Sequence, residues 1–301
     1  MLDNQTKQDL LKICPLEFDS PMSKRTTFKI GGPAECLAMP SCKEEVRSLL
    51  LYAREKAIPV TILGNCSNVL VSDEGIEGIT MLIGSGMSRV IIDGETVIAE
   101  AGITMGSLAQ ACTRSSLTGF EFASGIPGCL GGGVYMNAGA YNGELGALVE
   151  TVDILDEELN YVTLTKEQMG FAYRHTALSG RNVVILSATL KLKKGCSTEI
   201  AALVADYTRR RRERQPLTYP SAGSTFKRPE GAFAAALIDQ AGLKGLTVGG
   251  AQVSEKHAGF FINIGGATAQ DVLSLIKQVQ DIILEKNGIM LEPEIKIIGK
   301  R

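Results

Sequence analysis

The spacing of apolar residues marks the segments that we expect to fold as helices. The first helix is predicted over residues 41–56, where Ser41 followed by Glu44 forms a capping box. The clearest apolar stripe lies in residues 268–285, and Thr268 is the predicted N-cap of that helix. Further helices are predicted over residues 104–117, from about 198 to 214, and over 231–241.

Runs rich in β-branched residues, bounded by turn residues, predict strands between these helices. The turn Asp93-Gly94 separates residues 90–92 from 97–99, which is typical of a β-hairpin. A second predicted hairpin and the remaining strands cover residues 149–155 with 161–164, and 60–63, 69–71, 183–193, 252–253, 260–263 and 290–298. Helices mixed with antiparallel strands predict an α+β fold rather than repeated βαβ units.

A domain boundary is predicted between residues 205 and 220. The helix that starts near residue 198 ends in the basic run 209–214, and two prolines follow it. Such a run is usually a solvated helix end, because cations are favourable at a helix C-terminus. The alternative is that these arginines bind a phosphate-bearing substrate. We predict a first domain over residues 1–205 and a second over 206–301.

Composition and charge exclude several classes of protein. The chain has 301 residues, 45% of them hydrophobic and 21% charged, as expected for a globular protein of two or three domains. A net charge of -2 and the absence of Trp argue against a nucleic-acid partner or an anionic membrane surface. We expect no secretory signal and no membrane-spanning segment.

The seven cysteines form no CxxC pair, and only His175 and His257 could add nitrogen ligands. We therefore expect no bound metal and no disulfide framework, but reduced, mostly buried thiols of a cytoplasmic protein. Covalent attachment of a cofactor to a cysteine or histidine is the alternative.

The glycine segment, residues 124–139, is the most informative part of the chain. It holds six of the 33 glycines, and Ser124 and Asn137 add polar side chains. Glycine lets a ligand approach the main chain closely, and freed N–H groups can converge on phosphate oxygens. The segment matches neither GxGxxG nor GxxxxGK[ST], so a nucleotide would be held by a different fold. A tight structural corner is the alternative.

A second candidate ligand loop is the turn segment, residues 64–68. A predicted strand ends in Gly64, and Asn65 and Asn68 offer polar groups before the next apolar run. The alternative is the corner of a plain hairpin.

Two other segments combine a charged or hydroxyl group with turn residues. Residues 172–175 contain Arg174, which can bind a carboxylate or stabilise developing negative charge, unless it is an ordinary surface arginine. Residues 221–229 place Ser224 beside Lys227 and a second cation, which suits an anion site or a proton-donating hydroxyl. An ordinary turn is the alternative.

The last polar segment, residues 291–296, holds two carboxylates around Pro293 in otherwise apolar sequence. Strand alternation would place Glu292 and Glu294 on the same face. The alternative is an edge strand with solvated acids.

Taken together, six ordered motifs resemble the UDP-N-acetylenolpyruvoylglucosamine reductases, also called UDP-N-acetylmuramate dehydrogenases, of bacterial peptidoglycan synthesis. They run from about residue 20 to the C-terminus: Thr27–Gly32, Leu63–Leu70, Gly125–Tyr141, Tyr173-Arg174, Ala222–Lys227 and Leu291–Glu294. The resemblance implies an FAD-binding domain of the vanillyl-alcohol oxidase and p-cresol methylhydroxylase type. This domain would have two α+β subdomains, divided near residues 85–90, and a substrate-binding domain would follow it.

The resemblance also implies which residues lie on a non-covalently bound FAD. These are Gly64, Asn65, Cys66, Ser67, Asn68, Ser124, Gly125, Gly128, Gly131, Gly132, Asn137, Ala138 and Gly139.

The implied reaction has two halves. NADPH reduces FAD, and the flavin N5 then passes hydride to the methylene carbon of the enolpyruvyl ether. Arg174 matches the family's arginine that stabilises the resulting negative charge, Glu294 the glutamate that assists, and Ser224 the serine that donates the proton. The cofactor supplies the electron chemistry and the protein supplies orientation and electrostatics.

Substrate contacts are implied less directly, and the candidates are Tyr173, Lys227, Arg228 and His257. The sequence between Arg174 and Ser224 leaves no room for the tyrosine-bearing loop of some members, so the chain resembles the shorter subtype. We expect a monomer. Rival readings are a flavin oxidase or dehydrogenase acting on a sugar lactone or alcohol, and an inert nucleotide-binding module.

Overall fold

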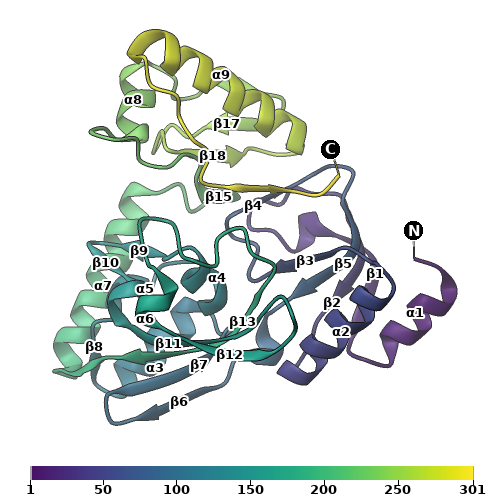
Figure 1. Ribbon diagram of the computed structural model, residues 1–301. Coiled ribbons are helices and arrows are strands. Elements are labelled where there is room, and N and C mark those ends of the chain that lie inside the picture. Colours follow the sequence, from purple (N-terminus) through teal and green to yellow (C-terminus); the bar gives the residue numbers. More distant parts are fainter. Residues whose placement is uncertain (1, 301) are drawn as a thin grey trace. The chain divides into compact units, whose positions relative to one another are not determined.

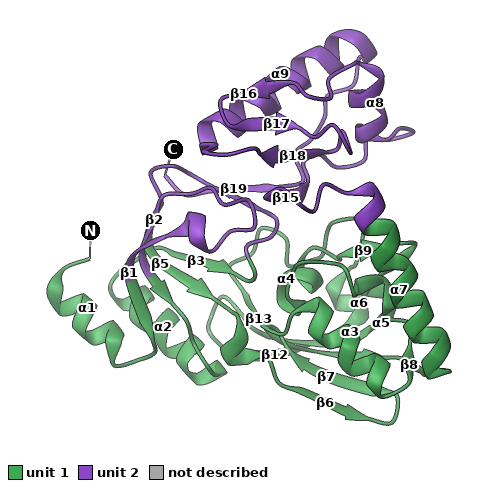
Figure 2. Cartoon of the chain, turned by 180° about the vertical axis from the view of Figure 1, so that it is seen from behind, with its two compact units in different colours: residues 1–17, 37–65, 78–211 green, residues 18–36, 66–77, 212–301 purple. Residues whose placement is uncertain are grey.

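The computed structural model describes residues 2–300 and divides into two compact units, coloured separately in Figure 2. Unit 1 comprises residues 1–17, 37–65 and 78–211, and unit 2 comprises residues 18–36, 66–77 and 212–301. Each unit is therefore assembled from three separate stretches of the chain. The predicted division into domains over residues 1–205 and 206–301 stays a prediction.

The centre of unit 1 is a five-stranded antiparallel sheet of order β12-β11-β13-β7-β6 (Figure 1). Its strands are β6 (Val90–Asp93), β7 (Thr96–Glu100), β11 (Val149–Leu155), β12 (Tyr161–Thr165) and β13 (Val184–Lys191). Both predicted hairpins are confirmed, since β6 pairs with β7 and β11 pairs with β12.

The helices of unit 1 include those predicted over residues 41–56, over 104–117 and from about 198 to 214. The full set is α1 (Asn4–Leu11), α2 (Lys43–Glu55), α3 (Met105–Arg114), α4 (Leu130–Tyr135), α5 (Leu145–Leu148), α6 (Lys166–Met169) and most of α7 (Ser197–Arg214). Short elements between them are η2 (Ser85–Met87), β8 (Leu117–Thr118), η3 (Glu121–Ala123), β9 (Gly139–Ala140), β10 (Gly143–Glu144) and β14 (Lys193–Lys194).

The predicted capping box at Ser41 and Glu44 is wrong. Helix α2 begins one residue after Cys42, whose side chain makes no cap hydrogen bond. Instead, the backbone N and Oγ of Ser41 donate to Glu45 Oε2 at 2.7 and 3.1 Å. The carboxylate of Glu45, one position after Glu44, therefore binds a residue that precedes the helix.

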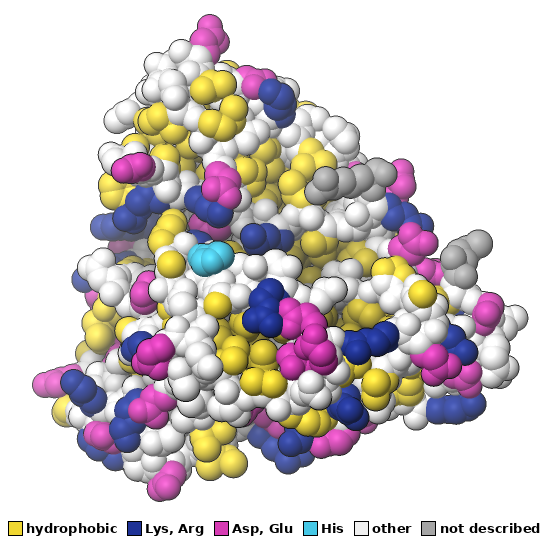
Figure 3. Space-filling model, in the orientation of Figure 1, with side chains coloured by type: hydrophobic (Ala, Val, Ile, Leu, Met, Phe, Trp, Pro, Cys, Tyr) yellow, Lys and Arg dark blue, Asp and Glu magenta, His cyan; other side chains and the backbone are white. Residues whose placement is uncertain are grey.

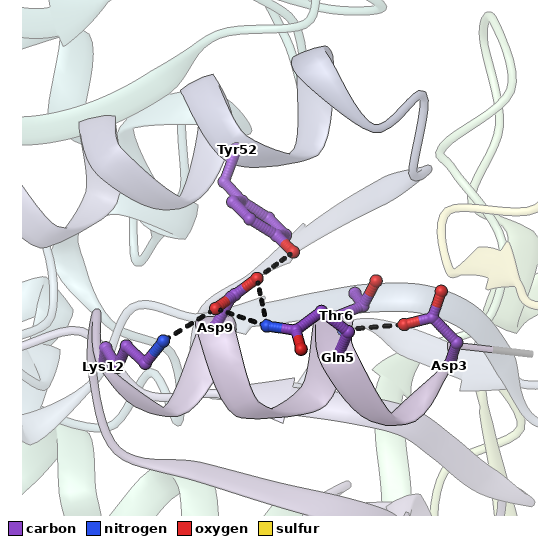
Figure 4. Close-up of polar contacts among 6 residues, drawn as sticks. All are labelled: Asp3, Gln5, Thr6, Asp9, Lys12 and Tyr52. Carbon is purple, nitrogen blue, oxygen red and sulfur yellow. Dashed lines mark hydrogen bonds and ion pairs between the residues drawn. The ribbon is translucent and has the colours of Figure 1, made fainter.

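Helix α1 is held by polar contacts around one aspartate (Figure 4). Asp3 caps the helix by accepting from Thr6 N at 2.7 Å. Asp9 accepts from Gln5, from Lys12 and from the hydroxyl of Tyr52, which belongs to α2. This shared carboxylate joins the first two helices of the chain.

A second sheet has the order β1-β2-β5-β3. Its strands are β1 (Leu16–Pro21), β2 (Pro33–Ala38), β3 (Val60–Leu63) and β5 (Ile76–Leu82). β3 pairs in parallel with β5, whereas β4 (Val69–Val71) pairs in parallel with β19 (Lys296–Ile298). The turn between β3 and β4 is therefore not the corner of a hairpin, and that alternative is excluded.

Unit 2 is an antiparallel sheet of order β15-β18-β17-β16 packed against two helices (Figure 1). Besides β4, β19 and parts of β1, β2 and β5, its elements are η1 (Met22–Lys24), β15 (Ser221–Ser224), α8 (Ala234–Gln240), β16 (Thr247–Val248), β17 (Ala251–Val253), β18 (Phe260–Asn263) and α9 (Ala269–Asn287). The predicted cap of α9 is confirmed, because Thr268 and Asp271 exchange capping-box hydrogen bonds. Its apolar stripe is buried at Val272, Leu275, Ile276, Val279 and Ile283.

The predicted strand over residues 290–298 is shorter in the structure. Only Lys296–Ile298 forms a strand, and Pro293 makes an isolated bridge with Phe226. Proline has no N–H to continue a ladder, which explains the interruption. Among the described residues, no helix is long and apolar enough to cross a membrane. On the face drawn in Figure 3, basic and acidic side chains are interspersed.

Candidate active site

The two predicted ligand loops meet within unit 1. Asn65 Nδ2 donates to the carbonyl of Pro127, and a β-carbon on Gly64 would overlap Cys129 Sγ. The absence of a side chain at Gly64 therefore lets the end of β3 lie directly against the glycine segment. The rest of the turn segment, residues 66–68, belongs to unit 2.

The start of the glycine segment carries polar groups without protein partners. Ser124 Oγ is buried and has no hydrogen-bond partner among the described residues. The half-buried Arg211 lies beside it, since a β-carbon on Gly125 would be 3.0 Å from Arg211 Cδ and 3.2 Å from its Nη1. Burial lowers the pKa of Arg211, and no ion pair of this side chain occurs within residues 2–300. A cation and an orphan hydroxyl at a glycine loop suit an anion such as phosphate.

Arg211 was not distinguished from its neighbours by sequence reasoning. Arg209 and Arg210 pair with Asp206 on the exposed side of α7, as a solvated helix end should. Arg211 differs because the helix turns it toward Gly125. The one signal in the sequence is the helical period, which separates the face of α7 that carries Arg211 from the face that carries Arg210.

The other glycines of the segment divide between packing and open surface. Gly131 is buried, and a β-carbon there would lie 2.8 Å from Ala101 Cβ. Gly128 accepts a hydrogen bond from Met105 N at 3.0 Å. Gly132 is exposed and has open space where a β-carbon would lie. The segment thus combines a tight structural corner with an accessible glycine surface.

Arg174 lies on a tight turn at the far end of this segment. Ala172 and His175 exchange two backbone hydrogen bonds of 3.0 and 3.2 Å, so Tyr173 and Arg174 are the two loop residues. Arg174 has a φ of 53°, in the left-handed region that glycine favours. Its Nη2 donates to the carbonyl of Gly139 at 3.3 Å. The structure therefore brings the candidate arginine to the end of the glycine segment.

Ser224 is presented by a β-bulge rather than by the ordinary turn considered above. Ser221 pairs with Ile262 and Ser224 pairs with Phe260, so β15 has one residue more than β18 between these pairs. Gly223 has a φ of 80°, which permits the bulge. Ser224 is exposed.

Glu294 lies in unit 2, on a segment that is hydrogen-bonded to residues 225–227, directly after the strand of Ser224. Glu294 N donates to the carbonyl of Thr225 at 2.8 Å, and Lys227 N donates to the carbonyl of Glu292 at 2.9 Å. Asn68 Nδ2 donates to the carbonyl of Glu294 at 3.3 Å. Glu292 is exposed and Glu294 is half-buried, so the two carboxylates have different surroundings.

The candidate substrate residues differ in how they are engaged. Lys227 forms an ion pair with Glu292, and Arg228 stacks over the ring of Phe233 at 4.4 Å. Tyr173 is exposed, with the Arg174 guanidinium 5.3 Å from its ring.

His257 is constrained by its own loop. Its Nδ1 accepts from Gly259 N at 3.1 Å, and its ring packs edge-on against Phe260. Burial lowers the pKa of His257, so the ring is neutral at pH 7.

Five of the seven cysteines are buried, which confirms the prediction that the thiols are mostly buried. Burial raises the pKa of Cys14 to about 11 and that of Cys112 to about 12. These thiols are protonated at neutral pH and are poor nucleophiles.

The residues present fit a flavin dinucleotide. The two glycine loops in contact, the orphan Ser124 hydroxyl, the open surface at Gly132 and the unpaired Arg211 could hold its phosphates and neighbouring atoms. Within residues 2–300 no carboxylate pairs with Arg211, which leaves it available to an anion.

Comparison with known proteins gives the class. Residues 34–162 match the FAD binding domain family. Alkyldihydroxyacetonephosphate synthase, 15% identical with a TM-score of 0.51, shares the fold over 64% of this chain and 41% of its own length. The chain has an FAD-binding domain with the vanillyl-alcohol oxidase type of α+β fold, as predicted.

The family follows from closer relatives. Residues 215–298 match the C-terminal domain of UDP-N-acetylenolpyruvoylglucosamine reductase. The reductase of Caldanaerobacter subterraneus is 48% identical over 98% of this chain and 97% of its own, and that of Latilactobacillus sakei is 45% identical over 94% and 93%. The crystal structure of the Thermus caldophilus reductase has a TM-score of 0.80 at 33% identity, covering 94% of this chain and 98% of its own. The chain belongs to the UDP-N-acetylenolpyruvoylglucosamine reductase family.

Proposed function

We propose that the chain reduces UDP-N-acetylglucosamine enolpyruvate to UDP-N-acetylmuramate with NADPH, through Arg174, Ser224 and Glu294. The reaction supplies peptidoglycan synthesis, and with it cell-wall growth, cell shape, the cell cycle and cell division. The observation that carries the residue roles is the placement of exposed Ser224 on a glycine bulge whose extension pairs with the Glu294 segment.

When bound, FAD supplies the two-electron chemistry that links NADPH to the methylene carbon of the substrate. Negative charge then develops at the adjacent carbon and its carboxylate. Arg174 stabilises this charge by bidentate hydrogen bonding, and Glu294 assists. Ser224 donates a proton to the adjacent carbon, which completes the D-lactyl ether. A serine is a poor acid, but the strongly basic carbon and nearby cations favour the transfer.

FAD contact is proposed for the turn segment and for the glycine segment apart from the Asn137 side chain, with Arg211 added because it lies against Gly125. The side-chain amides of Asn68 and Asn137 already donate to protein carbonyls, which limits the hydrogen bonds that they can offer to FAD. We propose substrate contact for Tyr173, Arg228 and His257, and for Lys227 in exchange with its partner Glu292.

We propose that the chain belongs to the shorter subtype, which lacks the tyrosine-bearing loop. Basic side chains then bind the diphosphate of the substrate in place of that loop. We further propose a monomeric enzyme of the cytoplasm, where NADPH and nucleotide sugars are available.

The test is to purify the protein, record its visible flavin absorbance, and follow NADPH oxidation with and without the enolpyruvyl substrate. We expect a yellow protein whose sustained NADPH oxidation requires that substrate. A protein that takes up no FAD, or whose turnover ignores the substrate, would end the proposal.

A further inference from the structure

Asn137 is the most thoroughly engaged polar side chain of the glycine segment. Only 1% of it is exposed, and its φ is 42°. Its Oδ1 accepts from Gly146 N at 2.8 Å, and its Nδ2 donates to the carbonyl of Ala172 at 3.0 Å. The partners fix the orientation of the amide, since one is a donor and the other an acceptor.

The acceptor of this bond is the base of the turn that carries Arg174. The carbonyl of Ala172 also closes the turn by accepting from His175 N at 3.2 Å. One carbonyl oxygen thus receives both the turn's own hydrogen bond and the amide of Asn137. Moving the asparagine would release the base of a turn whose second loop residue is already in the left-handed region.

The tip of the same turn is held two residues further along the glycine segment. Arg174 Nη2 donates to the carbonyl of Gly139 at 3.3 Å. Asn137 and Gly139 therefore hold the base and the tip of one turn from a single short stretch. Bulk is excluded there, because a β-carbon on Gly139 would lie 2.6 Å from the carbonyl oxygen of Gly143.

We propose that Asn137 is a positioning residue that fixes the Arg174 guanidinium for the substrate half-reaction, rather than a flavin contact. The inference rests on the proposed function of Arg174. It assigns the glycine segment a second role, as the seat of the turn that carries the arginine.

The principal variant is Asn137→Asp. It keeps the acceptor for Gly146 N and tolerates a positive φ, but an ionised carboxylate cannot donate to Ala172 and repels its carbonyl. The matched control is Thr176→Val. Thr176 is fully buried, and its Oγ1 donates to the carbonyl of Tyr135 at 3.1 Å, so its hydroxyl joins the same two stretches through a carbonyl other than that of Ala172.

Three properties are measured on the FAD-loaded enzyme: the FAD spectrum and affinity, the rate of flavin reduction by NADPH, and the rate of reoxidation by the enolpyruvyl substrate. We expect Asn137→Asp to leave the first two within about twofold and to slow reoxidation by about 10- to 100-fold, the effect of a misplaced catalytic group. Thr176→Val should leave all three unchanged apart from stability.

Two further readouts separate positioning from a general structural role. Burial raises the pKa of the introduced carboxyl group, and its protonated form can donate to Ala172, so acidification should restore reoxidation relative to the natural enzyme. In the Arg174→Ala background, Asn137→Asp should cause no further loss, because the two residues act as one unit.

The outcomes distinguish this inference from the proposed function. If Arg174→Ala reoxidises normally, the role of Arg174 and the inference fall together. If Arg174→Ala is slow but Asn137→Asp is not, only the inference falls. Loss of FAD, equal slowing of both half-reactions, or additive losses in the double variant would also overturn it. Should Asn137→Asp not fold, Asn137→Ser provides the same comparison, except for the recovery at acidic pH.

Discussion

Arg174 is held in a strained backbone conformation, and this strain can be measured separately from its chemistry. Its φ of 53° is left-handed, which costs a non-glycine residue about 1–2 kcal/mol. Arg174→Ala keeps that strain, whereas Arg174→Gly relieves it. Glycine also raises the entropy of the unfolded chain, which lowers the free energy of unfolding by about 0.4–1 kcal/mol and offsets part of the relieved strain. The glycine variant should therefore be the more stable of the two by about 1 kcal/mol.

Both variants lack the guanidinium and its bond to Gly139, so they differ only in backbone preference. Urea unfolding and thermal unfolding give the comparison, and about 1 kcal/mol corresponds to about 2–4 °C for a unit of this size. Both should slow reoxidation by the substrate by about 10²- to 10³-fold, because each removes a charge-stabilising donor. Equal stability would refute the strain, and normal reoxidation would refute the role.

Three further predictions concern the glycines and the histidine of the candidate site. Gly64→Ala would overlap Cys129 Sγ and should lower the free energy of unfolding by about 1–3 kcal/mol. Gly132→Ala places its methyl group in open space, so it should retain the stability of the FAD-free protein and weaken only FAD binding. Similar losses of stability of the two variants in urea would contradict this. Gly223→Ala should cost about 1–2 kcal/mol in urea unfolding, since its φ is 80°, and should slow reoxidation in stopped flow by displacing Ser224; a normal rate would exclude a role for the bulge. Because burial lowers the pKa of His257, its contribution to stability is present above about pH 6.5 and is lost as the pH falls. His257→Asn should therefore lose less stability than the natural protein on acidification, and an equal loss would show that another group is responsible.

The locally encoded parts of the fold could be predicted from sequence. Helix α9, its cap at Thr268 and its apolar stripe depend on residues a few positions apart, so the pattern contains them. The hairpin at Asp93-Gly94 is equally local. The cap of α2 was predicted wrongly because Glu44 and Glu45 are neighbours in the sequence, and only the folded helix shows that Ser41 bonds to Glu45.

The arrangement of the site depends on contacts between distant residues. The sequence pattern predicted that the turn segment and the glycine segment are ligand loops, but it could not show that Gly64 lies against Cys129. It could not show that the Asn137 amide donates to the turn that carries Arg174, because the two bonded residues are 35 positions apart. The bulge at Gly223 arises from pairing with β18, which no local signal specifies.

The central claim is that Ser224 donates the proton that completes reduction of the enolpyruvyl substrate. The most direct measurement is a single turnover of NADPH-reduced Ser224→Ala with that substrate, beside Ser221→Ala from the other end of the same bulged strand. We predict normal flavin reduction in both, normal reoxidation in Ser221→Ala, and reoxidation slowed by about 10²- to 10⁴-fold in Ser224→Ala. Reoxidation of Ser224→Ala at the rate of its control would contradict the claim.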